Sequence, residues 1–439
     1  MTWQQLPQVR AAQRRTLTLL SVAQVLGGIG TGAGFSVGIL IAEQVTSSAG
    51  WAGVARTGTT VGAALISVPL AVVAMRRGRR VSLGGGWLVS AAGSVLMVLA
   101  AQLAGAGSMN HDGHPMGPPV SGQVAVVATL ALVVGMTAAG AGSAVGLQMR
   151  YAATDLAEPA HAGRHLSLVV SATTVGSVLG PNLGVPGEGL SRLLGMAPLA
   201  GPFVIAAVVQ FLAAIAVLAM RPDPLLLAQQ HTGLDARRKR PPLWRSLKLA
   251  WGIGPARFAL VAMSAAHTVM VGVMTMTPVH LDHHGATVTV VGITVSLHVL
   301  GMYALSPVVG TLADRFGPVP MAATGAIVLL TATAVAGFGS NSVVWVTVGL
   351  TMIGLGWCLC TVSAAAALTR SVSVDRTTVQ GAADAMMNFS AAIGAGLSGP
   401  LLGIIGFGGL NVIAAAMVLI AVPIAVSGLR RPTPTPELR

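Results

Sequence analysis

The chain has 439 residues, of which 54% are hydrophobic and 8% are charged, and its formal net charge is +13. A soluble domain has about 25% charged residues, so this composition excludes a soluble enzyme or a soluble binding domain. Apolar runs of 20 to 28 residues recur along the whole chain, and each is long enough to cross the roughly 30 Å hydrocarbon core of a bilayer as a helix. The sequence therefore predicts an all-α membrane protein.

Twelve membrane-spanning helices are expected, and the first is too long to be the core of a signal peptide. Gly and Ala are abundant in the apolar runs, as is usual where helices pack closely inside a membrane. The predicted spans are 16–42, 51–75, 81–103, 122–149, 164–186, 199–220, 256–280, 288–313, 318–339, 343–369, 377–405 and 408–429.

The basic residues gather on one side of these spans. Arg76 to Arg80 follow the second span, and the run from Arg237 to Arg240 lies in the long loop after the sixth. Of the 25 Lys and Arg residues, only Arg56 and Arg192 fall on the opposite side. Because Lys and Arg accumulate on the cytoplasmic side of a membrane, we expect both termini in the cytoplasm and the 104–121 loop outside. The net charge then orients the protein and requires no nucleic-acid partner.

The first six spans and the last six spans are followed by similar residues at matching positions. Arg150 and Asp155 follow the fourth span, and Arg370 and Asp375 follow the tenth, in each case 220 residues later. Duplicated helical units with a substrate site between them are typical of secondary transporters. We therefore expect two pseudo-symmetric six-helix bundles. The predicted divisions are 1–221 for the first bundle, 222–255 for a basic cytoplasmic linker and 256–439 for the second bundle.

The loop after the eighth span carries the clearest motif, "GTLADRFG" at 310–317. It resembles the G-x-L-a-D-r-x-G loop of the major facilitator superfamily, and the resemblance extends over essentially the whole chain. It implies a gating or structural role for Gly310, Asp314, Arg315 and Gly317. A glycine permits close helix approach, and the carboxylate can face a helix N-terminus across the domain interface.

The matching loop after the second span departs from this motif. It keeps Gly78 and its arginines but has Met75 where the acid is expected. A symmetrical pair of gating latches is therefore in doubt.

The chain also lacks the motifs of other protein classes. It has no G-x-x-x-x-G-K-[ST] loop for nucleotide binding and no pattern of a serine or metal hydrolase. We therefore expect a transporter rather than an enzyme, without a cofactor, working as a monomer in the bacterial cytoplasmic membrane. Its partners would be the lipid bilayer and a small substrate or metal ion.

Methionine and histidine recur at a spacing of four in the seventh and eighth spans. Met270 and Met274 share one helix face, as do His298 and Met302. Thioether and imidazole groups are ligands that suit Cu(I), and being neutral they need no buried carboxylate. Packing is the alternative role for each methionine, whereas a histidine deep in a membrane favours function.

The same pair of motifs resembles the signature of CcoA-type copper importers within the superfamily. That resemblance implies that Met270, Met274, His298 and Met302 bind copper and that the protein imports it. His267, on the face of Met270, is a candidate accessory ligand. So are His280, His283 and His284 at the outer mouth and the histidines of the 104–121 loop, although incidental histidines in a solvated loop explain these outer groups equally well.

A proton-coupled exporter of drugs or small metabolites is the alternative function. "GSVLGPNLG" at 176–184 resembles the G-x-x-x-G-P-x-x-G motif of the antiporter branch, and it gives Gly180 and Pro181 a packing or gating role. Asp384, the clearest acid within a span, is a candidate proton relay, with ion pairing as the alternative. With 4% aromatic residues, the chain is poor in the side chains that line a large drug pocket.

Overall fold

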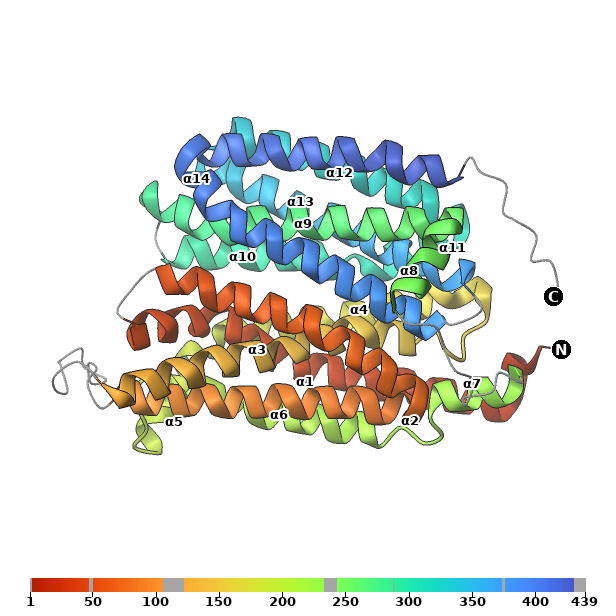
Figure 1. The fold of residues 1–439 in the computed structure, drawn as a ribbon, viewed down its shortest axis with the longest axis horizontal. Coiled ribbons are helices and arrows are strands. Elements are labelled where there is room, and N and C mark those ends of the chain that lie inside the picture. Colours follow the sequence, from red (N-terminus) through yellow and green to blue (C-terminus); the bar gives the residue numbers. More distant parts are fainter. Residues whose placement is uncertain are drawn as a thin grey trace. The chain divides into compact units, whose positions relative to one another are not determined.

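The computed structural model describes residues 2–46, 50–105, 122–232, 243–286, 288–372 and 376–429. Every regular element in these ranges is a helix, which confirms the all-α fold class (Figure 1). The helices are α1 (Pro7–Thr46), α2 (Gly50–Gly105), α3 (Gln123–Ala152), α4 (Ala162–Leu179), α5 (Gly184–Leu193), α6 (Ala200–Leu218), α7 (Pro224–Thr232), α8 (Leu243–Gly252), α9 (Gly254–His283), α10 (Val288–Tyr303), α11 (Ser306–Phe316), α12 (Pro318–Phe338), α13 (Val343–Ser371) and α14 (Arg376–Leu429), with short 3-10 helices at Trp3–Gln5, Pro159–His161 and Gly180–Leu183.

The predicted spans correspond to these helices once two bends are counted. Both α2 and α14 contain two spans, separated at Gly78 (φ 87°) and at Gly406 (φ 69°). Positive φ values of this size are accessible to glycine at little cost, so each glycine permits a turn between two helices. The eighth span is divided into α10 and α11, and the fifth is interrupted at Gly180–Leu183. The prediction of twelve spans is consistent with this arrangement.

The first helix differs from its prediction because hydropathy marks the apolar part of a helix rather than the whole of it. Helix α1 begins at Pro7, nine residues before the predicted edge at Thr16. Its polar first turns include Val9 and Ala12, which are buried. The linker likewise contains helices α7 and α8, while its basic run lies at 233–242, outside the described residues.

The chain forms two compact units. Unit 1 comprises residues 1–152 and 172–231, and unit 2 comprises residues 153–171 and 232–439. The segment 153–171, which holds the start of α4, therefore belongs with unit 2 rather than with the first half of the sequence. The predicted three-part division of the chain stays a prediction.

Small residues allow the helices of each unit to approach closely. In unit 1, a Cβ on Gly140 of α3 would lie 2.7 Å from the main-chain nitrogen of Ala63 in α2. In unit 2, a Cβ on Gly325 of α12 would lie 2.7 Å from Cys360 Sγ in α13. Cys358 and Cys360 are buried free thiols in this packing. Glycine at such positions brings backbones together where no hydrophobic driving force exists between helices.

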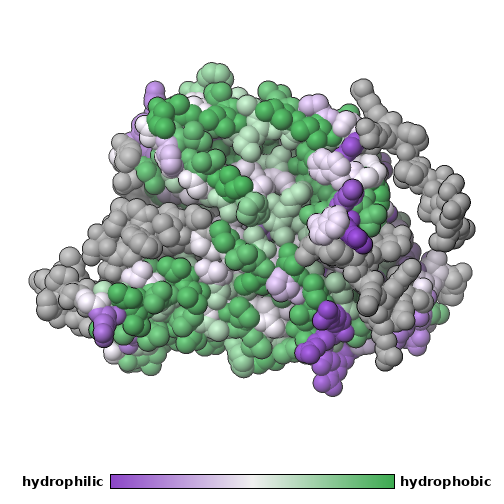
Figure 2. Space-filling view, viewed as in Figure 1, coloured by the Kyte–Doolittle hydropathy of each residue, from purple (hydrophilic) through white to green (hydrophobic). Residues whose placement is uncertain are grey.

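Apolar side chains cover the visible sides of each unit, and hydrophilic ones gather toward the helix ends (Figure 2). On α3, Val126, Leu130 and Val134 form a stripe one turn apart and are 58%, 59% and 52% exposed. Eight of the described helices are long and apolar enough to cross a membrane, and two of those eight contain two spans each. This surface suits a lipid environment.

Candidate functional site

An aromatic and imidazole cluster joins three helices of unit 2 around Trp357 of α13. Trp357 is 2% exposed, and its indole Nε1–H donates a hydrogen bond to His267 Nδ1 of α9 over 2.9 Å. The ring of Tyr303, at the end of α10, meets the Trp357 ring edge to face at 5.6 Å and 82°. Because Nδ1 of His267 accepts this bond, the neutral ring carries its proton on Nε2. We call this group the Trp357 cluster, and Tyr303 is its partly exposed member.

His298, a predicted copper ligand on α10, is completely buried against α13. Its Nδ1 lies 2.7 Å from the carbonyl oxygen of Leu350. A carbonyl only accepts, so Nδ1–H donates and the lone pair of the neutral ring is on Nε2. Gly354 allows this approach, since a Cβ there would lie 3.1 Å from the Met302 nitrogen. His298 and the buried Met302 therefore lie at the contact between α10 and α13.

Two of the three predicted methionine ligands lie on α9, which packs chiefly against α14 and α13. Met270 is buried and Met274 is half-buried. A site shared by these four ligands requires α9 and α10 to face each other, and α10 packs chiefly on α13. Among the described residues, no group of three or more His, Cys, Asp and Glu side chains is placed to hold a metal ion. A four-ligand copper site stays a prediction.

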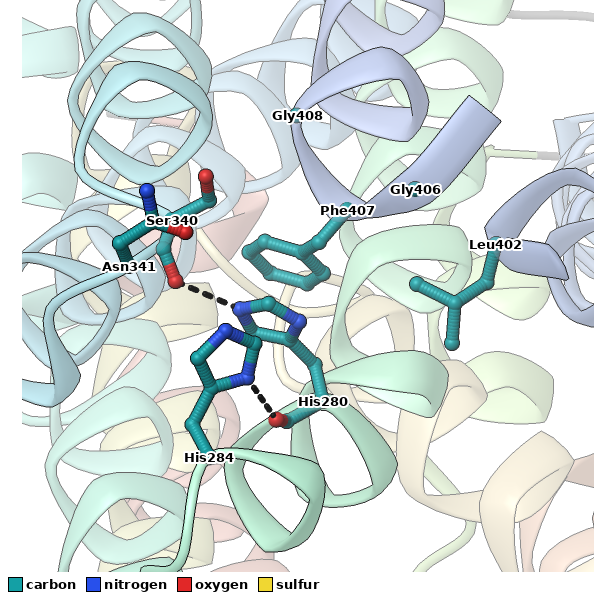
Figure 3. Close-up of a pocket in the computed structure, with 8 residues that line it drawn as sticks. All are labelled: His280, His284, Ser340, Asn341, Leu402, Gly406, Phe407 and Gly408. Carbon is teal, nitrogen blue, oxygen red and sulfur yellow. Dashed lines mark hydrogen bonds between the residues drawn. The ribbon is translucent and has the colours of Figure 1, made fainter. Parts of the chain in front are cut away.

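Two of the predicted accessory histidines line a cavity of about 360 Å³ at one end of unit 2 (Figure 3). His280 Nε2–H donates to the Ser340 carbonyl oxygen over 2.7 Å, and the His280 ring stacks on Phe407 at 4.2 Å and 8°. His284 Nδ1–H donates to the His280 carbonyl oxygen over 2.8 Å. These contacts connect the end of α9, the α12–α13 turn and the bend of α14. The side chain of His283 and the 106–121 loop lie outside the described parts.

The loop motif places Asp314 of α11 at the N-terminus of α4, within unit 2. Its carboxylate accepts hydrogen bonds from the main-chain N–H groups of Gly163 at 3.0 Å and Arg164 at 2.8 Å. The guanidinium of Arg370, at the end of α13, forms an ion pair with the same carboxylate. A negative charge at this position satisfies N–H groups that the helix itself leaves unpaired. The sequence predicted a helix N-terminus as the partner of Asp314, and its gating role stays a prediction.

The other residues of the motif support this contact. Gly310 faces α4 so closely that a Cβ would lie 2.5 Å from the Gly163 carbonyl oxygen. Gly317 (φ 93°) forms the turn into α12. Arg315 is exposed, and its guanidinium lies 5.3 Å from the centre of the Phe316 ring.

The antiporter-like motif lies in unit 1 where α4 ends. A Cβ on Gly180 would lie 2.6 Å from Gly32 Cα of α1, which explains the need for glycine there. The side chain of Pro181 lies outside the described parts, although its backbone belongs to the 3-10 helix that interrupts the span. Asp384 is completely buried in α14 of unit 2, and its main-chain oxygen accepts a hydrogen bond from Asn388 at 2.8 Å. Its proton-relay role stays a prediction.

Sequence reasoning missed several residues of these sites. Trp357 and Tyr303 carry no spacing motif, and their only signal is that the chain has just 7 Trp and 2 Tyr. The sequence marks Arg370 as part of the repeat but does not indicate its ion pair with Asp314. Its counterpart in the repeat, Arg150, is 2% exposed, and Asp155 forms an ion pair with Arg376 at 3.1 Å. The repeat thus marked polar contacts without identifying the partners.

Comparisons with known proteins agree on the family. The chain is 32% identical to the uncharacterized MFS-type transporter YddS of Bacillus subtilis over 428 residues, covering 95% of this chain and 92% of that one. It is 27% identical to the riboflavin transporter RfnT of Brucella anthropi over 392 residues, covering 89% and 90% of the two chains. The structure of the human organic anion transporter MFSD10 has a TM-score of 0.70 at 14% identity, covering 94% and 99%. The model of the Major Facilitator Superfamily matches residues 20–287 and 259–439, and the chain belongs to this family.

Proposed function

We propose that this protein carries a small organic solute with a planar ring and that Tyr303 contacts the solute. As a member of its family it is a multi-pass membrane transporter and not an enzyme. The observation that carries the proposal is the Trp357 cluster, in which the ring of the partly exposed Tyr303 packs edge to face on Trp357, which is itself hydrogen-bonded to His267. Aromatic rings supply large contact areas with preferred edge and face geometries, and a few polar groups fix orientation in most ligand sites.

Two further observations support this substrate class. The relative RfnT is named a riboflavin transporter, and riboflavin has a planar ring system. The chain has only 4% aromatic residues, and the Trp357 cluster brings two of them into contact. Riboflavin is therefore the first probe to use.

Uptake of radiolabelled riboflavin by cells expressing the protein tests this proposal. We expect saturable uptake by the wild type, loss of at least about tenfold for Tyr303→Leu, and near-normal uptake for Tyr303→Phe, because the ring provides the contact. Phe338→Leu is a matched control, since it also removes a ring in unit 2 and Phe338, at the end of α12, is 93% exposed. Equal uptake by Tyr303→Leu and wild type at matched protein levels would rule out the assigned contact. Uptake no higher than in cells without the protein would rule out riboflavin.

Copper(I) import is the second candidate, and the geometry of His298 favours it. A metal-binding histidine usually donates its other ring N–H to a carbonyl or carboxylate, and His298 Nδ1–H donates in this way to Leu350. Its Nε2 lone pair and the Met302 thioether, one turn away, are soft donors on one helix.

The copper arm of the same experiment uses ⁶⁴Cu accumulation. If the soft donors bind copper, Met274→Leu, Met302→Leu and His298→Gln should each lower accumulation severalfold. Met→Leu nearly preserves volume and costs less than about 1.5 kcal/mol when the role is packing. Met276→Leu is the control, because Met276 lies two residues from Met274 on another face of α9. Wild-type accumulation in all three ligand variants would eliminate copper as the cargo.

We also propose that the protein lies in the bacterial cytoplasmic membrane with both termini inside. The asymmetry of Lys and Arg supports this orientation. A single Cys introduced at His114, with Cys358 and Cys360 changed to Ala, should react with an impermeant maleimide added outside intact cells. Reaction only after the membrane is opened would reverse the proposed topology.

A further inference from the structure

We propose that Asp223 is a positioning residue that ties the bend of α2 to the start of the linker in unit 1. Its Oδ2 accepts the main-chain N–H of Arg80 over 2.8 Å. Its Oδ1 accepts the N–H groups of Leu225 at 3.0 Å and Leu226 at 3.2 Å. Arg80 lies in the first turn after the α2 bend, and Leu225 and Leu226 lie in the first turn of α7. One carboxylate therefore caps the N-termini of two helices that are far apart in sequence.

The glycine at the bend is required by this contact. Gly78 has φ 87°, a value that disfavours any side chain. A Cβ at Gly78 would also lie 2.5 Å from the Asp223 carboxyl carbon. The carboxylate thus lies directly on the turn, where Figure 1 draws α7 near the bend of α2. Both the backbone conformation and the close approach of the acid explain why glycine occupies this position.

Asp223 gives the first half an acid that its loop motif lacks. In the second half, Asp314 precedes the Gly317 turn by three residues and caps α4. The first half has the equivalent turn at Gly78, but the position three residues before it is Met75, which is buried and has no carboxylate. The acid comes instead from the segment after the sixth span, 143 residues from Arg80.

The segments that follow the sixth and twelfth spans show the opposite pattern, with the acid in the first half. Arg221-Pro222-Asp223-Pro224 follows the sixth span, and Arg-Pro-Thr-Pro at 431–434 follows the twelfth, with Thr433 in place of the acid. Each half of the sequence therefore has an acid at one of the two positions and not at the other. Residues 431–434 lie outside the described parts, so the comparison at that end concerns sequence alone.

The position of Asp223 explains why the tie matters for a transporter. Helix α7 is the first part of the linker between the sixth span and α9. A contact that holds the first turn of α7 therefore also holds the point where the linker leaves unit 1. A carboxylate is suited to this task, because its two oxygens accept bonds from both helices and its charge favours both N-termini.

Hydrogen–deuterium exchange of the full-length protein in nanodiscs tests the proposal without a known substrate. In the wild type we expect slow exchange in peptides covering 79–86 and 225–232. Asp223→Ala should raise the exchange rate at least about tenfold in both peptides, because each loses its capping acceptor. Asp223→Ser should restore protection of 225–232 only, since serine caps its own helix but is too short to reach Arg80.

The controls distinguish a carboxylate that connects α2 to α7 from one that caps α7 alone. Glu188→Ala, an acid change elsewhere in unit 1, should leave both peptides as in the wild type. Faster exchange of 225–232 alone in Asp223→Ala would show that Asp223 caps α7 and nothing else, and the proposal would be wrong. Unchanged exchange in both peptides would overturn it as well. Failure of riboflavin or copper transport does not affect either outcome.

Discussion

Replacing Asp314 by Asn is expected to slow transport about tenfold while the protein stays folded. The carboxylate accepts two N–H groups of α4 and pairs with Arg370, and its side chain is only 12% exposed. An amide keeps one accepting oxygen but loses the charge, and such a change at a helix N-terminus costs about 1 to 2 kcal/mol. If one transport conformation depends on this contact, 1.4 kcal/mol shifts its population about tenfold. The measurement is the initial rate of uptake into vesicles, with riboflavin as the first probe.

A double-mutant cycle makes the Asp314 prediction independent of the substrate. Arg370→Gln alone should lower the free energy of unfolding. The double variant with Asp314→Asn should lose less stability than the two single variants lose together, because both single changes break the same ion pair. Met75→Ala is the control for transport, since Met75 holds the equivalent position in the first half without a charge. Wild-type transport by Asp314→Asn, or strict additivity in the cycle, would refute the proposed latch.

Gly310→Ala is expected to have the second large effect, for a steric reason. The added Cβ would lie 2.5 Å from the Gly163 carbonyl oxygen and 2.6 Å from Ser167 Cβ. Backbone cannot move aside as a flexible side chain does, so α11 and α4 must separate at a cost of about 1 to 3 kcal/mol. That separation would also pull Asp314 away from its N–H partners. We expect a lower unfolding temperature together with slower transport.

Gly292→Ala is the matched control for Gly310→Ala. Gly292 lies in α10 of the same predicted span, and a Cβ there would meet nothing within 4 Å. Alanine in an open helical position is neutral or stabilises by about 0.5 to 1 kcal/mol relative to glycine. Ser167→Gly should partly rescue Gly310→Ala by removing one of the two obstacles. Similar unfolding temperatures for the two alanine variants would contradict the close approach of α11 and α4.

The sequence determined which segments cross the membrane and which turn between them. Hydropathy over about 20 residues reports whether a helix can span a bilayer, so the two spans within α2 and the two within α14 were predictable, each pair being separated by a glycine with non-helical backbone angles. The loop motif also identified Asp314 and the kind of partner it has, because a carboxylate, two glycines and their spacing are local features.

Only the tertiary structure decided which helix each polar face meets. A spacing of four places His298 and Met302 on one face of α10, but it does not say whether that face contacts α9 or α13. The packing of α10 on α13 gave His298 its Leu350 partner, and the packing of α9 on α13 brought His267 to Trp357. Asp223 is the clearest case, since its bond to Arg80 joins residues 143 apart. Such contacts depend on how several helices pack at once, and no window of local sequence contains that information.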